Sequence, residues 1–143
     1  MRYVLVAVGF VLGAAAYIWT SNAEIPQAGA DLGLSSETAI VAIALPSSLS
    51  DQAQRGKALF DANCADCHAS NAVGQIDVAP PLVHEIYEPS HHGDESFQRA
   101  VAQGVRGHHW PFGDMPPIDD LSREDVEFVI EYVRELQRAN GIY

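Results

Sequence analysis

The amino-acid sequence predicts an all-α domain made of a few short helices, with little or no sheet. Apolar residues recur at helical spacing, next to polar capping residues, in three stretches that span residues 51–63, 94–104 and 123–139. The length of 143 residues favours one domain, and the only two cysteines fall in one run, Cys64-Ala65-Asp66-Cys67-His68, directly after the first stretch. We therefore expect short helices arranged around that run.

The charge balance excludes two classes of partner. The chain has 19 acidic and 8 basic residues, which gives a net charge of −11, and the basic residues are scattered. Nucleic acid and anionic lipid headgroups both require a basic patch, so neither is an expected partner. A protein that docks electrostatically should instead present Lys and Arg. Composition leaves open the simpler explanation that the acidity only keeps the protein soluble.

The N-terminus has the layout of an export signal. Arg2 is followed by the uncharged and almost wholly apolar run 3–19, and then by Ser21-Asn22-Ala23, which fits a small-x-small cleavage site. We predict a signal peptide at residues 1–23. Because the run is at the short limit of a membrane span, an uncleaved N-terminal membrane anchor is the alternative. In both cases the body of the protein is exported.

Residues 24–49 are predicted to be a leader or linker in front of the main domain, residues 50–143. The leader contains Pro, Gly and Ser and one apolar island, residues 39–45, which fits either a short strand or a turn of helix laid on the domain. The main domain begins with a helix for which Ser50 or Asp51 is the cap.

The run Cys64–His68 matches C-x-x-C-H, the sequence signature of covalent c-type haem attachment. Each thiol can form a thioether to the porphyrin, and the adjacent imidazole then reaches the iron. A C-x-x-C pair can also be a redox dithiol or half of a zinc site. A thioredoxin-like dithiol would follow a strand, whereas a helical pattern precedes Cys64, and zinc would need two further ligands. The sixth iron ligand must come from elsewhere, and apart from Met1 the only methionine is Met115.

On these residues, from about Ser50 to Tyr143, the chain resembles the class I monohaem cytochromes c. The resemblance implies a cytochrome c fold, in which the helices wrap around one covalently attached haem c. It also implies that His68 and Met115 are the two axial ligands of the haem iron.

The resemblance gives the first helix a packing role. Gly56 lies inside this helix, where Gly costs about 1 kcal/mol relative to Ala. In the family, a Gly and an aromatic residue at these positions contact the C-terminal helix, and Gly56 and Phe60 match that pattern, with Tyr132 on the partner helix. The alternative is that Gly56 marks only a helix start.

Downstream of the motif, Ala79-Pro80-Pro81-Leu82 is similar to the P-x-L pattern of the family. A metal-bound His generally donates its other ring N–H to a carbonyl. The resemblance implies that Pro80 supplies this carbonyl to His68 and that Leu82 packs on the haem. A plain Pro-Pro turn is the alternative.

The middle helix and the loop after it are expected to hold the methionine. Asp94 can cap this helix and Gly104 can end it, and family members have a helix here that forms a wall of the haem pocket. Two prolines directly after Met115 make the backbone rigid. Trp110 and Phe112 would cover the open side of the haem and exclude water, which helps to raise the reduction potential. An ordinary hydrophobic cluster explains the two aromatic residues equally well.

Five histidines besides His68 lie between the motif and Met115, more than a small cytochrome of this class needs: His84, His91, His92, His108 and His109. Three explanations stay open. They are surface residues, some of them hydrogen-bonded to haem propionates. They form an accessory metal site, for which copper is the first candidate because imidazoles at this density suit Cu and Zn. Or one of the last two replaces Met115 on the iron in some state, which would lower the potential.

The last helix has the clearest start signal. Ser122 followed by Asp125 resembles a capping box with Asp in place of Glu, and we predict a helix from Arg123 to Ala139. Its apolar face consists of Val126, Val129, Ile130, Val133 and Leu136 or Gln137, with Phe128 and Tyr132 on the border.

The sequence thus favours a one-electron carrier and not an enzyme, because an iron with both axial positions filled has no open site for substrate. The expected partners are redox proteins such as a quinol-oxidising complex, a periplasmic dehydrogenase or a terminal oxidase. The expected location is the periplasm, either soluble or anchored to the inner membrane. The alternative is a haem protein whose histidines bind or deliver copper. A third and weaker one is an enzyme in which Met115 dissociates and the iron turns over peroxide or a sulfur compound.

Overall fold

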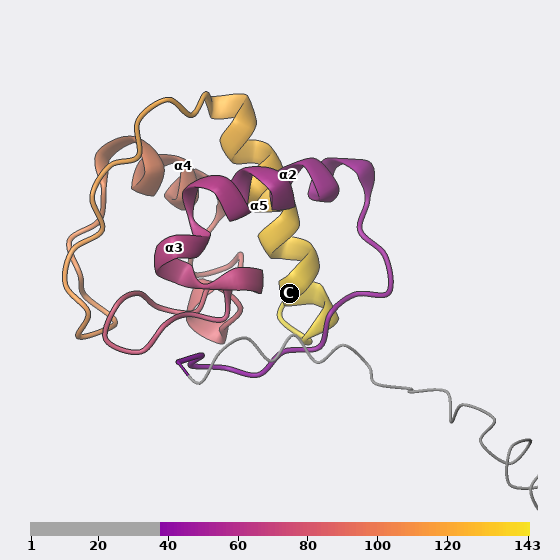
Figure 1. The fold of residues 1–143 in the computed structure, drawn as a ribbon, viewed down its shortest axis with the longest axis horizontal. Coiled ribbons are helices and arrows are strands. Elements are labelled where there is room, and N and C mark those ends of the chain that lie inside the picture. The colour runs from indigo at the N-terminus through magenta and orange to yellow at the C-terminus, as the bar shows by residue number, and fades with distance from the viewer. Residues whose placement is uncertain (1–37) are drawn as a thin grey trace, which may run out of the picture. The chain divides into compact units, whose positions relative to one another are not determined.

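The computed structural model describes residues 38–143, so the predicted signal peptide or anchor at residues 1–23 and the first part of the leader lie outside it. Within residues 38–143 the chain contains helices α2 (Asp51–Asn63), α3 (Ala65–His68), α4 (Asp94–Gln103) and α5 (Arg123–Ala139), with 3-10 turns η1 (Ser70–Ala72) and η2 (Glu85–Tyr87) (Figure 1). Extended segments in this part of the chain pair only through isolated bridges. The predicted all-α fold class is confirmed. None of these helices combines the length and the apolar character needed to cross a bilayer.

Both long helices begin at side-chain caps. Of the two candidates for α2, Ser50 is the cap, because its Oγ accepts from the Ala53 amide at 3.2 Å. α5 has the predicted capping box: Ser122 Oγ accepts from the Asp125 amide at 3.1 Å, and the Asp125 carboxylate accepts from the Ser122 amide at 3.2 Å. The predicted bounds of α5 are confirmed.

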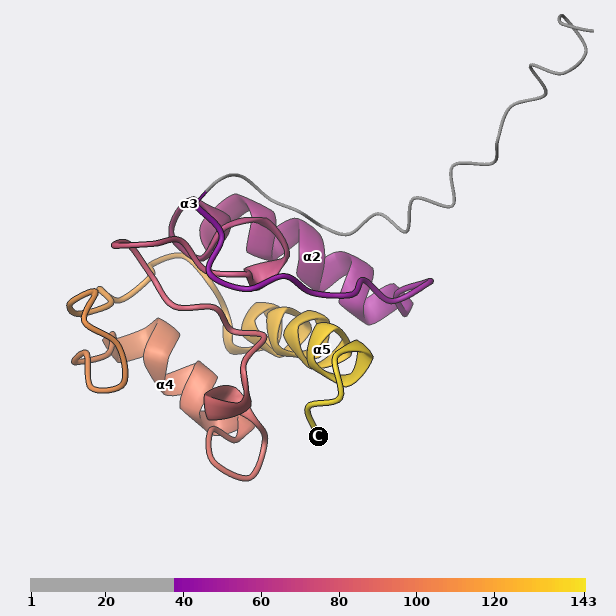
Figure 2. The same ribbon diagram turned by 90° about the horizontal axis from the view of Figure 1, so that it is seen from below.

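α2 crosses α5, and residues of both helices form the centre of the core (Figures 1 and 2). Gly56 permits the close approach, since a Cβ at this position would overlap the carbonyl oxygen of Phe128. One turn later, Phe60 packs edge-on against Tyr132 with ring centroids 5.6 Å apart. The expected helix contact is therefore present. The alternative that Gly56 marks a helix start is wrong, because α2 begins at Asp51.

The start of α4 differs from the prediction. Its cap is Gly93, which has no side-chain acceptor, and Asp94 is the first helical residue. The Asp94 carboxylate accepts instead from Nε of Arg134 in α5 at 3.0 Å. Asp94 therefore fastens α4 to α5 and does not cap α4. The helix ends as predicted at Gly104, which has a φ of +73°.

The apolar island at residues 39–45 forms neither of the two structures that the sequence allowed. Ala39 makes one isolated bridge to Gln75, and the rest of the island runs over the helices without regular structure. Ile43 enters the core with 5% of its surface exposed. Ala44 exchanges two hydrogen bonds with the Asn140 side chain, at 2.8 and 2.9 Å. The island thus buries one residue without forming a strand or a helix.

A charged side chain, Arg134 of α5, is part of the core. Only 5% of its surface is exposed. Besides Asp94 it donates to Gln137 Oε1 at 2.7 Å, to the Tyr87 carbonyl at 2.7 Å and to the His92 carbonyl at 2.6 Å. A buried guanidinium is tolerated when its donors are satisfied in this way. Arg134 therefore ties the chain between η2 and α4 to the C-terminal helix.

Candidate functional site

The C-x-x-C-H run lies at the junction of α2 and α3. Cys64 ends α2, where its amide donates to the Phe60 carbonyl at 2.8 Å, and α3 follows directly. The His68 amide donates to the Cys64 carbonyl at 2.9 Å, so one helical turn separates the two residues. This spacing places Cys64, Cys67 and His68 on one face of the turn. The Cys67 side chain is exposed and that of Cys64 is half-buried.

The two thiols do not have the environment of a redox dithiol. Burial, and to a smaller degree the neighbouring Cys67, raise the pKa of the Cys64 thiol from 9.0 to about 11. Reactive dithiols depend on the opposite, a lowered thiol pKa. A helix, and not a strand, precedes the pair. Zinc also loses support, because within residues 38–143 neither cysteine belongs to a cluster of three candidate ligands.

His68 is oriented by a backbone carbonyl. His68 is buried, with 8% of its surface exposed. Its Nδ1 lies 2.8 Å from the carbonyl oxygen of Pro80. A carbonyl oxygen can only accept, so Nδ1 carries the hydrogen and Nε2 keeps its lone pair. Burial lowers the pKa of His68, and the hydrogen bond to Pro80 opposes this only in part. The side chain therefore presents a neutral imidazole whose Nε2 can bind a metal.

Pro80 belongs to a packed turn and not to a plain exposed Pro-Pro turn. The Gly74 amide donates to the His68 carbonyl at 2.8 Å, and a Cβ on Gly74 would overlap the backbone nitrogen of Pro81. The Leu82 amide donates to the Ala72 carbonyl at 2.8 Å, and the Leu82 side chain is partly buried against the core. The chain after the motif thus holds the Pro80 carbonyl in place beside His68.

The segment between His68 and Gly74 contains residues that the sequence analysis missed. Ala69, Asn71 and Ala72 all have a positive φ, between 58° and 59°, a conformation that costs energy for residues other than glycine. The Tyr132 hydroxyl of α5 donates to Asn71 Oδ1 at 3.1 Å. Backbone strain of this kind gathers at functional sites, where the surrounding structure imposes it.

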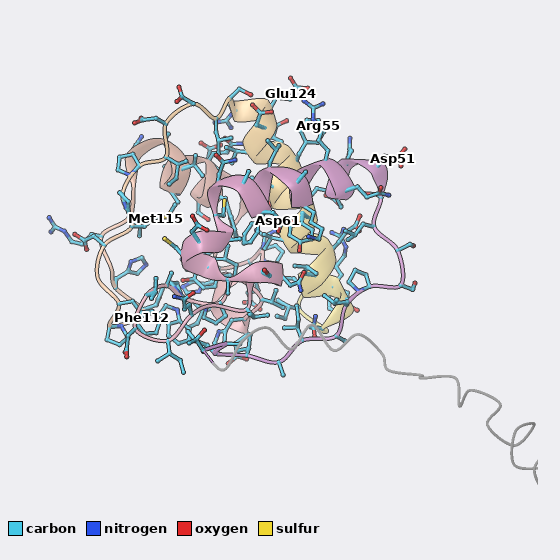
Figure 3. All side chains as sticks on the ribbon, viewed as in Figure 1. Asp51, Arg55, Asp61, Phe112, Met115 and Glu124 are labelled. Carbon is cyan, nitrogen blue, oxygen red and sulfur yellow. The ribbon has the colours of Figure 1, made fainter. Side chains whose placement is uncertain are left out.

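Met115 lies on a loop that is closed at its base by backbone hydrogen bonds. The Val105 and Met115 amides each donate to the other residue's carbonyl at 2.9 Å. Gly104 packs so closely that a Cβ there would lie 2.5 Å from the Met115 carbonyl oxygen. The Ile118 amide then donates to the Val101 carbonyl at 2.9 Å, which returns the chain to α4. Figure 3 shows Met115 on this loop, and both ribbon views place the loop and α3 on the same side of α5 (Figures 1 and 2).

The loop also carries the two predicted aromatic residues. Trp110 and Phe112 are stacked with ring centroids 5.8 Å apart and an interplanar angle of 11°, and His84 packs edge-on against Trp110 at 5.3 Å. Among the described residues, the buried indole Nε1 of Trp110 finds no hydrogen-bond partner in normal geometry. Tyr87 is its near neighbour: burial raises the pKa of the Tyr87 phenol to about 12, and Trp110 opposes this rise.

These residues fit a covalently attached haem. The same helical turn carries two thiols and one imidazole with a free nitrogen. These are the donors that such a haem needs. Within residues 38–143 the buried indole N–H has no acceptor in good hydrogen-bond geometry, and burying it so is unfavourable. A haem propionate is a group that could accept from it.

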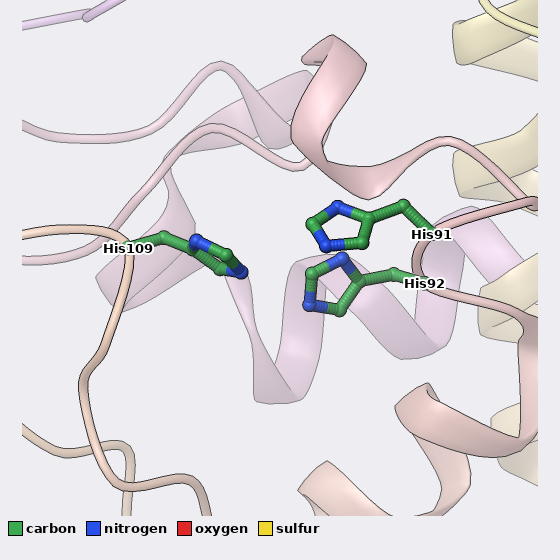
Figure 4. Close-up of side chains that lie close together, drawn as sticks. All are labelled: His91, His92 and His109. Carbon is green, nitrogen blue, oxygen red and sulfur yellow. The ribbon is translucent and has the colours of Figure 1, made fainter.

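Three of the five additional histidines come together. One ring nitrogen from each of His91, His92 and His109 lies within 4.8 Å of one from each of the other two (Figure 4). Desolvation, followed by the charges of its neighbouring imidazoles, lowers the pKa of His109. His108 contacts His109 with ring centroids 4.2 Å apart and the planes tilted by 49°, but it is not one of the converging three. His84 lies apart from them, against Trp110.

Arg134 is a further residue that the sequence analysis missed. It lies four residues after Ile130 and three before Gln137, on the face of α5 that was assigned to the core. A charged residue at a core position of a helical pattern was the available signal, because such a residue must find partners when it is buried.

Comparison with known proteins agrees with this geometry. The family described as "Cytochrome c" matches residues 53–137, which include the C-x-x-C-H run, Pro80 and Met115. No individual curated protein matches the chain. The match covers more than half of the 143 residues, and the chain belongs to the cytochrome c family, whose members transfer electrons through a covalently bound haem.

Proposed function

We propose that this protein is a one-electron carrier with a single haem c, attached through Cys64 and Cys67 and ligated by His68 and Met115. The observation that carries the proposal is the hydrogen bond from His68 Nδ1 to the Pro80 carbonyl at 2.8 Å. It fixes the ring orientation and leaves Nε2 as the only ring nitrogen available to a metal. When bound, the haem supplies an iron that gains and loses one electron.

The protein's own residues set the reduction potential of that iron. The Pro80 carbonyl makes the His68 imidazole a better donor through its hydrogen bond. Met115 is held by its two backbone hydrogen bonds to Val105 and by the rigid prolines that follow it. Pairing a histidine with a thioether raises the reduction potential relative to two histidines. Trp110 and Phe112, stacked on the same loop, exclude water from that side.

A carrier is favoured over an enzyme because His68 and Met115 would fill both axial positions. No coordination position would then remain for a substrate, and electron transfer through the exposed edge of the cofactor is the chemistry left. A net charge of −11 supports redox partners that present basic docking surfaces. We place the protein in the periplasm, soluble or anchored to the inner membrane through its N-terminus, where a respiratory complex, a dehydrogenase or an oxidase would exchange electrons with it.

Copper handling is the second candidate, and the convergence of three imidazoles favours it. It explains fewer features than the carrier does. The carrier explains the paired cysteines, the orientation of His68, the anchored Met115 loop and the buried indole, whereas copper handling explains the histidines alone. An accessory metal site is also compatible with electron transfer.

The visible spectrum of the haem-loaded protein tests the ligand assignment. We expect the weak methionine-to-iron charge-transfer band in the far red of the oxidised protein. Met115→Leu should remove this band. His109→Ala is the matched control on the same loop and should retain it. A wild-type spectrum without the band would overturn the assignment of Met115 and favour histidine ligation. A band that survives in Met115→Leu, or that disappears equally in His109→Ala, would also overturn it, because the band would then not report the Met115 sulfur.

A further inference from the structure

Two separate loops bring three imidazoles together at the surface. His91 and His92 come from the segment between η2 and α4, and His109 comes from the Met115 loop (Figure 4). The ring centroids lie 4.6 Å apart for His91 and His92, 5.3 Å for His91 and His109, and 5.2 Å for His92 and His109. Each ring is therefore a neighbour of the other two, although His109 is separated from the pair along the chain by α4.

The first two rings are oriented as metal ligands are. Nδ1 of His91 and Nδ1 of His92 lie 2.9 and 2.6 Å from the same acceptor, the carbonyl oxygen of Ile86. Since a carbonyl cannot donate, both Nδ1 atoms carry hydrogen, and both Nε2 atoms keep a lone pair. A histidine that binds a metal almost always donates its other N–H to a carbonyl or a carboxylate in this way.

His109 completes the set. Within residues 38–143 it makes no hydrogen bond, so a ring nitrogen is available to a ligand. One ring nitrogen of each of the three histidines lies within 4.8 Å of one ring nitrogen of each of the other two. With metal–nitrogen bonds of about 2.0–2.1 Å, neighbouring donors lie about 2.9 Å apart in a tetragonal site and about 3.3 Å apart in a tetrahedral one. His91 and His109 are exposed and His92 is half-buried, so the three rings have room to turn toward a metal ion.

The other two histidines do not belong to this set. Nδ1 of His84 accepts from the Ile86 amide at 3.2 Å, so a neutral His84 carries its hydrogen on Nε2 and has no free lone pair. Nδ1 of His108 also lies 2.8 Å from a carbonyl, that of Arg106, but the His108 ring centroid is 6.2 Å from that of His92, and His108 is not among the three histidines whose nitrogens lie within 4.8 Å of one another.

We propose that His91, His92 and His109 form a tri-imidazole site for one divalent transition-metal ion, with Cu²⁺ as the preferred ion. Imidazole suits both Cu and Zn, and Cu²⁺ binds most tightly among the divalent ions of the first transition row. Three protein ligands leave one position for water.

The bound ion would connect the Met115 loop to the C-terminal helix. Arg134 already holds the segment of His91 and His92 to α5, through the Tyr87 and His92 carbonyls at 2.7 and 2.6 Å. His109 lies on the loop whose base is the Val105–Met115 pair. Coordination therefore restrains the loop that carries Met115. This part of the inference rests on the proposed function, because it concerns the methionine ligand.

Calorimetric titration of the full-length, oxidised, haem-loaded protein with CuSO4, after treatment with a chelator, tests the site. We expect one Cu²⁺ per chain, and an electron paramagnetic resonance spectrum of the copper with hyperfine coupling from imidazole nitrogens. His109→Ala should weaken binding more than about 100-fold, because losing a ligand exceeds the 10–100-fold cost of losing an outer partner. His108→Ala is the matched control and should bind as the wild type does.

Two results would overturn the site: no binding of either CuSO4 or ZnSO4 by the wild-type protein, or equal losses in His108→Ala and His109→Ala. Amide hydrogen exchange gives the second readout, and we expect slower exchange in residues 105–115 when copper is bound. Unchanged exchange would overturn the restraint on the loop. The far-red methionine band is read separately, so a protein that shows the band but binds no copper refutes this inference alone. A protein that binds copper without the band refutes the Met115 assignment alone.

Discussion

The two sides of the proposed haem site are held by different kinds of structure. The His68 side follows from the crossing of α2 and α5, where Gly56, Phe60 and Tyr132 pack without space for one more methyl group. The Met115 side is a loop that is fixed mainly by backbone hydrogen bonds and carries exposed side chains. Since packing contributes more to folding than a few backbone hydrogen bonds at the surface, damage to the first side should unfold the protein. Damage to the second should change the iron ligand and leave the fold.

The largest effect is expected at the helix crossing. Gly56→Ala places a methyl group on the Phe128 carbonyl, and backbone cannot move away as a side chain can. We expect a loss of about 3 kcal/mol or more in the free energy of unfolding. Gly93→Ala is the control, because its Cβ would meet only the Pro89 carbonyl at 3.5 Å, and it should cost less than about 1 kcal/mol. Urea unfolding followed by circular dichroism measures both, and similar losses would contradict the packing argument.

The second effect concerns the tie between the histidine segment and α5. Arg134→Met leaves the His92 carbonyl and Gln137 Oε1 without their donor and the Tyr87 carbonyl with Gln137 Nε2 alone. We expect a loss of about 2–3 kcal/mol in the free energy of unfolding. Arg123→Met removes an exposed ion pair with Glu95 and should cost less than about 1 kcal/mol. Urea unfolding measures the stability of both variants. Equal stabilities of Arg134→Met and Arg123→Met would show that the hydrogen bonds of Arg134 contribute little to stability.

The third effect separates fold from ligand. Gly104→Ala forces a left-handed residue to carry a Cβ that lies 2.5 Å from the Met115 carbonyl, whereas Gly113→Ala has the same kind of φ, +91°, with nothing within 4 Å. Both should lose about 1–2 kcal/mol from the backbone conformation. Only Gly104→Ala should also weaken the far-red methionine band, since only it displaces Met115. Equal spectra in the two variants would contradict the anchoring role of Gly104.

The smallest effect is a pH dependence at the start of α5. The Ser122 hydroxyl and then the Ser122 amide lower the pKa of the Asp125 carboxyl below 3.8. The stabilisation is therefore present at pH values above 3.8 and is lost as the pH falls through the lowered pKa of the folded state. Asp125→Asn should be less stable than wild type at pH 7, and the difference should disappear in acid. Glu124→Gln, in the same turn, is the control, and a pH-independent difference for Asp125→Asn would refute the capping argument.

The features that could be predicted from the sequence are local. The capping box of Ser122 and Asp125, the apolar face of α5 and the role of Gly56 all depend on residues within one helix or on one pairing that the family resemblance supplied. The cap of α4 was predicted incorrectly because Asp94 uses its carboxylate on Arg134, a residue 40 positions away. Nothing within one helix reveals such a competitor.

The histidines show the same limit in the candidate site. Five of them could be found in the sequence, but only the folded chain shows that His109 meets His91 and His92, while His84 turns to Trp110. The orientation of the His91 and His92 rings depends on the Ile86 carbonyl. Every residue has a backbone carbonyl, so the sequence does not show which one will accept from a given side chain. The prediction for the Ala39–Leu45 island was wrong for a related reason. A continuous apolar run has no periodicity that would distinguish a helix from a strand.

The bridge between Val105 and Met115 makes residues 106–114 an insert that is closed at its base. Its two ends meet at a fixed point on the scaffold, so the insert can be lengthened, shortened or exchanged for another sequence while the thioether stays where it is. Surface properties that partners recognise, and any metal that the insert helps to bind, can therefore change while the position of Met115 is kept.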